Sequence, residues 1–262
     1  MGVLNVTPDS FSDAGRFLEP GRAIEQGLAM VEAGADIIDV GGESTRPGAL
    51  APGAAAELER ILPVIEGLRR ASDVLLSVDT SEPVVMTAAI AAGVDLLNDV
   101  RALRGPGALE VAARGGVPIC LMHMQGEPPT MQDLPRYGNV VDEVVAFLRG
   151  RIAACISAGV PADSLILDPG FGFGKTLEHN LELLRRLDVL VAEGFPVLVG
   201  LSRKGLIGEL AGAAGRSPGE RLGGSLALAL AARERGVRIV RVHDVAPTVQ
   251  AFRVMDRIES KV

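Results

Sequence analysis

Two kinds of apolar segment alternate along the chain, separated by turn-forming residues. Short runs rich in β-branched residues and leucine predict β-strands at 2–6, 36–40, 74–78, 95–98, 117–122, 164–167, 196–200 and 238–242. Longer segments with helical spacing predict helices at 21–33, 54–70, 83–92, 107–113, 140–158, 177–187, 218–235 and 246–259. The pattern therefore predicts eight consecutive strand–helix units.

The predicted strands are apolar along their whole length, which is typical of a parallel sheet covered by helices. Eight units in 262 residues fit a TIM (β/α)8 barrel better than a doubly wound sheet of five or six strands. No low-complexity linker or charge block interrupts the pattern, so we predict one α/β domain over residues 1–262.

Polar residues follow all eight predicted strands, whereas the opposite strand ends carry glycine, proline and alanine turns. In TIM barrels the active site lies at the carboxyl ends of the strands. The alternative interpretation, that each polar residue only caps a helix, stays open at every single position. The residues at these ends are Asn5, Glu43 to Arg46, Asp79, Asn98, His123, Asp168, Ser202 to Lys204, Arg241 and His243.

The loops after the first two strands are longer than the usual two to six residues. The first loop is rich in helix-capping residues, and we predict that it forms a lid over a substrate. The second carries Arg46 beside the hydroxyls of Ser44 and Thr45. An arginine with neighbouring hydroxyls suits a phosphate or carboxylate, so we expect an anionic ligand there.

Asp79, Asn98 and Asp168 each end an apolar strand, without the histidine and cysteine spacing of a metal cage. Two carboxylates and an amide suit a heterocycle rich in N–H donors. A glycosidase could also use two carboxylates, but its sugar platforms are usually aromatic and aromatics are 3% here. Residues 170–176 resemble a nucleotide-binding P-loop, but they have one residue too few between the outer glycines. The glycines instead suggest that the backbone approaches a flat ligand closely, with Phe173 stacked on it.

The last two predicted strands are followed by basic residues. Ser202 and Lys204 follow the seventh, and Arg241 and His243 follow the eighth. TIM barrels often hold phosphate at these two loops, so we favour an anion site over a structural role. His123 has no clear preference between the two roles.

The net charge and the amino-acid composition restrict the classes of binding partner and the cellular location that we expect. The net charge of −7 argues against nucleic acid and acidic membranes, and no apolar run has the length of a membrane span. Cys120 and Cys155 do not suggest a disulfide framework and no signal peptide is visible, so a cytoplasmic location is expected. Lysine is rare, with Lys175, Lys204 and Lys261 among 26 basic residues; two of the three follow strands at the predicted active end.

Six segments, in order, resemble the signatures of the dihydropteroate synthases, a family of pterin-binding TIM barrels. They are MGVLNVTPDSFSD, DVGGESTRPGA, LMHMQGEPPTMQ, LDPGFGFGKT, GLSRKGLIG and RVHDV, and the resemblance spans essentially the whole chain. It implies a transferase of folate biosynthesis that joins 6-hydroxymethyl-7,8-dihydropterin diphosphate to 4-aminobenzoate, giving 7,8-dihydropteroate and pyrophosphate.

The resemblance also implies roles for the matching residues, with Asp168, Lys204, Arg241 and His243 as the catalytic group. It implies a magnesium cofactor bound through Asn5 and a homodimer formed through outer helices. In the family pattern, the pterin contacts are Asp79, Asn98, Asp168 and Lys204; the diphosphate contacts are Thr45, Arg241 and His243; the aminobenzoate pocket is formed by Ser44, Arg46, Phe173 and Ser202.

Two alternatives remain at this stage. A methyltetrahydrofolate–corrinoid methyltransferase shares the acids and amides that read a pterin, but the TPDSFSD and SRK segments speak against it. A non-catalytic pterin-binding paralogue is disfavoured because Asn5, Arg46, Lys204 and His243 are all present. The synthase interpretation is therefore preferred.

Overall fold

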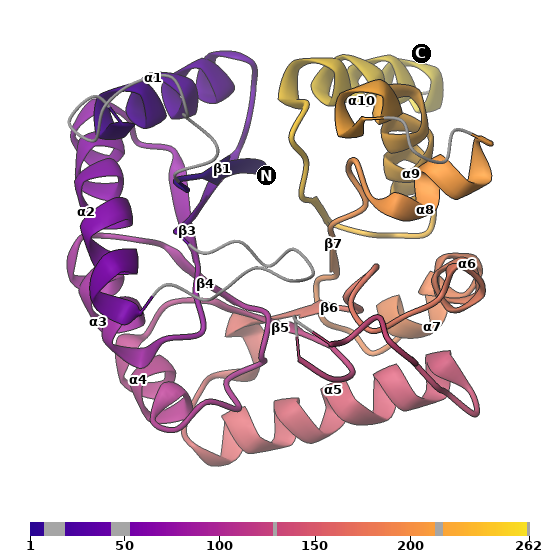
Figure 1. The fold of residues 1–262 in the computed structure, drawn as a ribbon, viewed down its shortest axis with the longest axis horizontal. Coiled ribbons are helices and arrows are strands. Elements are labelled where there is room, and N and C mark those ends of the chain that lie inside the picture. The colour runs from indigo at the N-terminus through magenta and orange to yellow at the C-terminus, as the bar shows by residue number, and fades with distance from the viewer. Residues whose placement is uncertain (8–18, 43–52, 128–129, 213–216, 261–262) are drawn as a thin grey trace.

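The computed structural model describes residues 1–7, 19–42, 53–127, 130–212 and 217–260, in which strands and helices alternate (Figure 1). The strands are β1 (Gly2–Asn5), β2 (Ile37–Gly41), β3 (Leu75–Asp79), β4 (Leu96–Asp99), β5 (Ile119–Met122), β6 (Leu165–Asp168), β7 (Leu198–Val199) and β8 (Ile239–Val240). The α-helices are α1 (Glu19–Glu32), α2 (Ala54–Ala71), α3 (Pro83–Ala91), α4 (Ala108–Gly115), α5 (Val140–Ser157), α6 (Leu177–Arg185), α7 (Leu187–Val191), α8 (Gly205–Leu210), α9 (Leu222–Glu234) and α10 (Val245–Glu259). Two 3₁₀ turns precede β6 and α9: η2 (Ala162–Ser164) and η3 (Pro218–Arg221).

All strand pairs are parallel and follow sequence order. β1 to β6 form one sheet and β7 pairs with β8. A bridge between Leu167 and Val197 connects β6 to the start of β7, and a bridge between Gly2 and Val242 connects β1 to the end of β8. The amide of Val242 donates to the carbonyl of Met1 at 2.9 Å across this last seam. The eight strands therefore close into a ring, and the predicted TIM barrel is confirmed.

The structure differs from the predicted pattern mainly in its last third. The predicted helix 177–187 is two helices, α6 and α7, that meet at Arg186, and the segment after β7 contains the additional short helix α8. β7 and β8 keep only two residues each. In the part of the chain that the structure describes, no helix is both long and apolar enough to cross a membrane.

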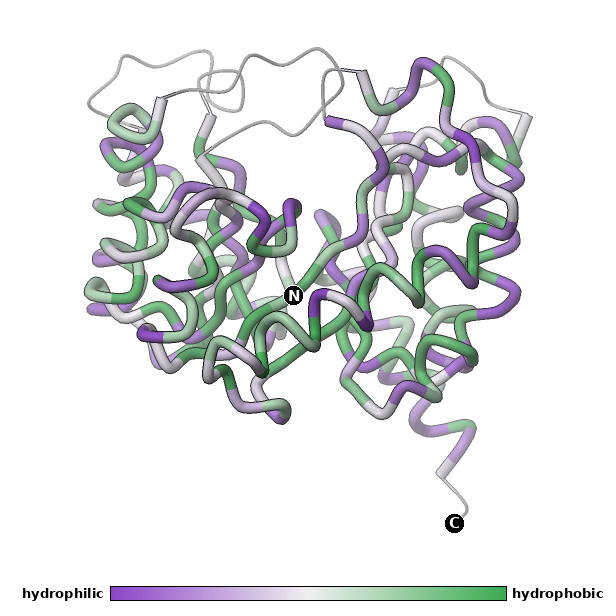
Figure 2. Tube along the Cα trace, turned by 90° about the horizontal axis from the view of Figure 1, so that it is seen from below, coloured by the Kyte–Doolittle hydropathy of each residue, from purple (hydrophilic) through white to green (hydrophobic). Residues whose placement is uncertain are grey.

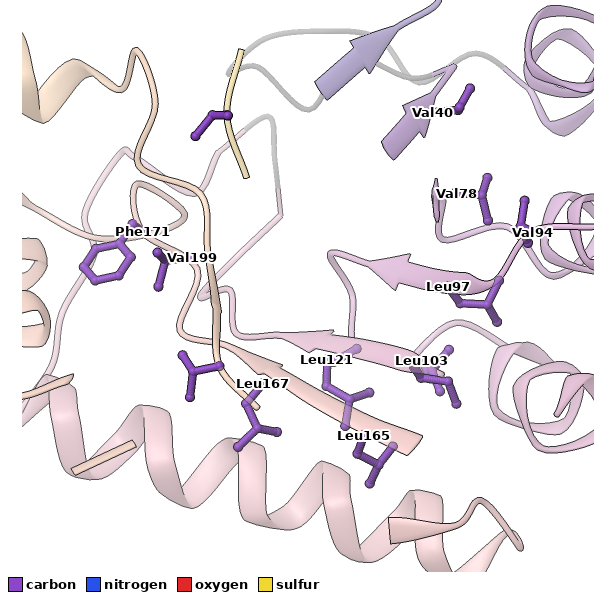
Figure 3. Packing of buried hydrophobic residues seen from close by; sticks show 14 of the residues in the cluster. Val40, Val78, Val94, Leu97, Leu103, Leu121, Leu165, Leu167, Phe171 and Val199 are labelled. Carbon is purple, nitrogen blue, oxygen red and sulfur yellow. The ribbon is translucent and has the colours of Figure 1, made fainter. Parts of the chain in front are cut away.

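The larger core lies between the strands and the surrounding helices. Val40, Val78, Leu97, Leu121 and Leu167 point outward into it from five consecutive strands (Figure 3). Hydrophobic and hydrophilic positions alternate along the helices around the strands (Figure 2), which is the pattern of helices with one face on a core. This packing fixes the strands as a rigid scaffold.

The barrel interior has two levels, because side chains alternate between the two faces of a strand. An apolar layer fills the amino-terminal half and consists of Met1, Ile37, Leu96, Cys120, Ile166, Leu198 and Ile239. Two residues after Ile37, Leu96, Ile166 and Ile239, the inward positions are polar, and Asp79 of β3 lies level with Asn98. This polar layer consists of Asp39, Asp79, Asn98, Asp168 and Arg241. The position of the polar layer thus follows from strand periodicity.

Candidate active site

Arg241 lies at the centre of the polar layer and joins three strands. Its Nε donates to Oδ2 of Asp39 at 2.6 Å, and its Nη2 donates to Oδ2 of Asp79 at 2.8 Å. The side-chain amide of Asn98 donates to the same Asp39 oxygen at 3.2 Å. Residues from β2, β3, β4 and the end of β8 therefore form one connected group, as expected for Asp79, Asn98 and Arg241.

The charges of this group are strongly coupled. Burial raises the pKa of Asp79 to about 7; Arg241 opposes the shift and the negative charge of Asp39 adds to it. Burial disfavours the charged guanidinium of Arg241, but Asp39 and Asp79 outweigh this and raise its pKa. Arg241 therefore stays a cation, while burial makes ionisation of Asp79 less favourable than in water.

Asp168 of the polar layer interacts with Lys204, which lies between β7 and α8. Oδ1 of Asp168 accepts a hydrogen bond from the amide of Gly170 at 2.7 Å. Burial raises the pKa of Asp168 to about 6, although this hydrogen bond and the charge of Lys204 oppose the shift. Burial and Arg241 lower the pKa of Lys204 to about 8. Asp168 and Lys204 therefore oppose each other's shift, as an ion pair would.

Lys204 also contacts an aromatic ring. Its backbone caps the amino end of α8, and its Nζ lies 4.1 Å from the centre of the Phe173 ring. Such a cation–π contact orients the ammonium group. The structure thus brings together Lys204 and Phe173, which the sequence analysis had assigned to different subsites.

Ser202 and His243 are neighbours at the carboxyl end of the barrel. The Ser202 hydroxyl accepts from the His243 backbone amide at 3.2 Å and lies 3.1 Å from Nδ1 of its ring. Burial, together with Arg241 and Arg203, lowers the pKa of His243 to about 4, so the ring is neutral at pH 7. Arg203 itself is held by Asp244 through two hydrogen bonds of 2.9 and 2.5 Å.

Lys175 and His123 form a buried contact beneath the loop that follows β6. Nζ of Lys175 lies 2.9 Å from Nδ1 of His123 and donates to the carbonyls of Gly170 and Phe173 at 2.9 and 3.0 Å. Burial and Lys175 lower the pKa of His123 to about 3, so its neutral ring accepts this hydrogen bond. Burial lowers the pKa of Lys175 to about 7. Both residues hold the glycine-rich loop to the loop after β5.

The glycines of that loop serve the same contact, which corrects the sequence-based interpretation. A Cβ at Gly170 would lie 1.9 Å from the carbonyl oxygen of His123, and one at Gly174 would lie 2.2 Å from that of Gln125. Both residues also have positive φ, at 66° and 60°. At Gly170 and Gly174, the close approach in this structure is to the backbone after β5.

The remaining predicted residues lie at the rim or outside the described ranges. Asn5 ends β1 in a half-buried position, level with Gly41 of β2 and so with Asp79 of β3. Ser44, Thr45 and Arg46 fall in residues 43–52, outside the described part of the chain, so their assignment stays a prediction.

The sequence analysis did not identify Asp39, which is the one fully buried carboxylate of the polar layer. The predicted site residues lie at the ends of strands or after them, whereas Asp39 lies inside β2, two residues before its end. A charged residue in the middle of an apolar strand was the available signal. Its inward position, two residues after Ile37, would have placed it beside the others.

Comparison with known proteins agrees with this geometry. Residues 1–243 match the family model described as "Pterin binding enzyme". The chain is 50% identical to the dihydropteroate synthase of Escherichia coli (strain K12) over 256 residues, covering 98% of this chain and 90% of that protein. It is also 50% identical to the Haemophilus influenzae dihydropteroate synthase over 254 residues, covering 97% and 91%.

Solved structures give the same result. The Xanthomonas albilineans dihydropteroate synthase with 4-aminobenzoic acid has a TM-score of 0.94 and 50% identity, with 100% of this chain and 93% of that chain covered. The same enzyme in complex with 7,8-dihydropteroate has a TM-score of 0.90 and 46% identity, covering 100% and 94%.

Fold and site together define a barrel enzyme with a buried, charged binding site at the carboxyl ends of its strands. With these matches, the chain belongs to the pterin-binding enzyme family, in its dihydropteroate synthase branch.

Proposed function

We propose that this chain condenses 6-hydroxymethyl-7,8-dihydropterin diphosphate with 4-aminobenzoate, forming 7,8-dihydropteroate and pyrophosphate. The observation that carries the proposal is the grouping of Asp79, Asn98, Asp168, Lys204 and Arg241 at one end of the barrel, in a chain half identical to known synthases. Acceptors for a nitrogen-rich ring and cations for a diphosphate lie side by side there.

The pterin ring binds in the polar layer. Its N–H donors require acceptors, which the carboxylates of Asp79 and Asp168 and the amide oxygen of Asn98 supply. Lys204 donates to a ring acceptor, since its ammonium group is compact and already oriented over Phe173. The ring thus replaces part of the internal pairing that these residues make in the free enzyme.

The diphosphate binds toward the rim, near Arg241, His243 and the predicted contact Thr45. Arg241 remains charged because two carboxylates support it, and it stabilises the charge that develops on the leaving group. His243 is neutral at pH 7 and donates or accepts a hydrogen bond there without adding charge.

Asn5 fits a magnesium ion that arrives with the diphosphate. It offers one neutral oxygen, and the described residues contain no group of three or more histidine, cysteine or acidic side chains that would hold an ion by themselves. Magnesium accepts such a site because it keeps waters and phosphate oxygens in its shell. When bound, the ion would neutralise charge on the leaving diphosphate.

The reaction proceeds by cleavage of the bond between the pterin methylene carbon and the diphosphate oxygen, whose electron pair leaves with pyrophosphate. The electron-rich dihydropterin stabilises the resulting cation, and the carboxylate of Asp168 balances its charge. The amine of 4-aminobenzoate then donates its electron pair to the methylene carbon and loses a proton. No covalent bond to the protein is required.

The 4-aminobenzoate pocket comprises Phe173, Ser202 and the predicted residues Ser44 and Arg46, with the first two loops excluding water. Homodimer formation also remains a prediction that rests on the resemblance, and a cytoplasmic location remains a prediction that rests on the sequence pattern.

Turnover of defined substrates tests the proposal. Purified protein is incubated with the dihydropterin diphosphate, 4-aminobenzoate and Mg²⁺, and dihydropteroate and pyrophosphate are quantified together. Equimolar formation of both is the expected result. Pterin binding without any product would indicate a non-catalytic binder and overturn the proposal, as would methyl transfer from methyltetrahydrofolate to a corrinoid.

A further inference from the structure

Asp39 forms hydrogen bonds with two residues of the proposed substrate site. Its side chain is fully buried, and its Oδ2 accepts from Nε of Arg241 at 2.6 Å and from Nδ2 of Asn98 at 3.2 Å. Both donors belong to the predicted substrate contacts and come from β8 and β4, on either side of β2 and β3. The hydrogen bonds of Asp39 to described residues therefore go to two of the residues proposed to contact substrate.

The other oxygen of Asp39, Oδ1, is buried and has no hydrogen-bond partner among the described residues. A buried carboxylate with an unpaired oxygen is costly, so its pairing with Arg241 is the interaction that makes the charge tolerable. The dependence is mutual, because Arg241 loses its strongest partner if Asp39 is neutralised.

The guanidinium of Arg241 divides its donors between two different carboxylates. Nε faces Asp39, whose side chain is 0% exposed. Nη2 lies 2.8 Å from Oδ2 of Asp79, whose side chain is 13% exposed. A guanidinium has five N–H donors, and Nη1 makes no hydrogen bond to the described residues. A ligand can therefore replace Asp79 on the Nη side while the Nε side stays bound.

We infer that Asp39 is a positioning residue that holds Arg241 by Nε and Asn98 by its amide, so that the carboxylate of Asp79 is released to the pterin ring when substrate binds. Without Asp39, Arg241 turns both edges toward Asp79 in a bidentate pair, which withdraws Asp79 from the pterin and moves the guanidinium away from the diphosphate. This inference rests on the proposed function.

Kinetics of Asp39→Asn test it. The KM for the dihydropterin diphosphate should rise about tenfold or more, because the negative charge that holds Arg241 by Nε is lost, while the KM for 4-aminobenzoate at saturating pterin stays within about twofold. The matched control is Ser77→Ala: Ser77 is the residue of β3 in register with Asp39, is equally buried, and its hydroxyl makes no hydrogen bond to the described residues. This control should leave both constants unchanged.

A double-variant cycle separates positioning from a general effect on the barrel. If Asp39 acts mainly through Arg241, Asp39→Asn adds less than about twofold to the loss already caused by Arg241→Ala. If Asp39→Asn multiplies the loss of Arg241→Ala by its full single-variant factor, Asp39 acts independently and the inference is wrong.

A measurement on the unaltered chain covers the case in which Asp39→Asn does not fold. The ¹⁵N–¹H signal of Arg241 Nε should be visible through protection from solvent and should stay in place when pyrophosphate and Mg²⁺ are added, whereas the Nη signals shift. Loss or movement of the Nε signal on addition would overturn the inference. Absence of dihydropteroate formation by the unaltered chain would instead overturn the proposed function, so the two failures are distinguishable.

Discussion

The apolar and polar layers of the barrel interior lie only two residues apart along the strands, yet one stabilises the fold and the other forms the proposed binding site. Leu96 precedes Asn98 on β4, Ile166 precedes Asp168 on β6, and Ile239 precedes Arg241 at the end of β8. The apolar layer excludes water and stabilises the fold by burial. The polar layer places several charges in a weakly solvated space, where each one interacts strongly with its neighbours.

This difference between the layers explains how the fold stays stable although its active site contains buried charges. Buried charges are costly, so they are placed at the end of a ring whose helices and apolar layer already supply the stability. Changes in the two layers should therefore have separable effects, one on turnover and the other on folding.

The largest effect is expected in the polar layer. Asp168→Asn and Lys204→Ala should each lower kcat/KM by about 10³-fold, because charge balance for the reacting pterin is lost in a water-poor site. The melting temperature should change little, since neither residue packs in the apolar core. Steady-state assay of pyrophosphate release, beside circular dichroism of each variant, measures both. Near-normal turnover in either variant would refute its assignment.

The opposite result is expected in the apolar layer. Leu96→Ala removes a side chain that is 4% exposed and should lower the free energy of unfolding by about 2–5 kcal/mol. At a temperature where the variant stays folded, its kcat/KM should remain within about twofold. Urea denaturation and kinetics on the same preparation check this. A loss of turnover comparable to that of Lys204→Ala would break the separation between the layers.

An intermediate effect is expected where the scaffold supports the site directly. Gly170→Ala should lower both stability, by about 1–3 kcal/mol, and kcat/KM, about tenfold, because the new methyl group meets the carbonyl of His123. Gly194→Ala is the matched control: its φ is +84°, but nothing lies within 4 Å of the added Cβ. It should cost about 1 kcal/mol of stability through backbone strain alone and leave turnover unchanged. Equal effects of the two variants would show that the contact with His123 is unimportant.

The smallest effect expected is a pH dependence of ligand binding. Raised pKa values of about 7 for Asp79 and about 6 for Asp168 mean that both carboxyls gain protons as the pH falls through that range. Because protonated carboxyls accept hydrogen bonds less well, affinity for dihydropteroate should fall about tenfold between pH 7 and pH 6. Fluorescence titration across this range measures it, and dihydropteroate is suitable because it carries no phosphate. An affinity that does not change with pH would mean that these carboxylates do not accept hydrogen bonds from the pterin ring.

Much of the fold followed from local pattern, because strands and helices impose their periods on the sequence within a few residues. The site residues that directly follow strands, such as Asp79 and Asp168, were accessible for the same reason. Asp39 was missed because its partners lie far along the chain; Asp39 and Arg241 are 202 positions apart. The role of Lys175 was left open, and its contact with His123 joins residues 52 positions apart. Contacts at that separation depend on ring closure, which strand pattern suggests but does not place atom by atom.

The central claim is that the polar layer is the pterin site, and affinity for 7,8-dihydropteroate tests it most directly. Calorimetric titration at pH 8 would compare the unaltered chain with Asp168→Asn and Leu96→Ala. The account predicts that Asp168→Asn weakens binding about 100-fold, through loss of a charged acceptor in a buried site, while Leu96→Ala stays within about twofold. Equal affinity of all three proteins, or a loss confined to Leu96→Ala, would contradict it.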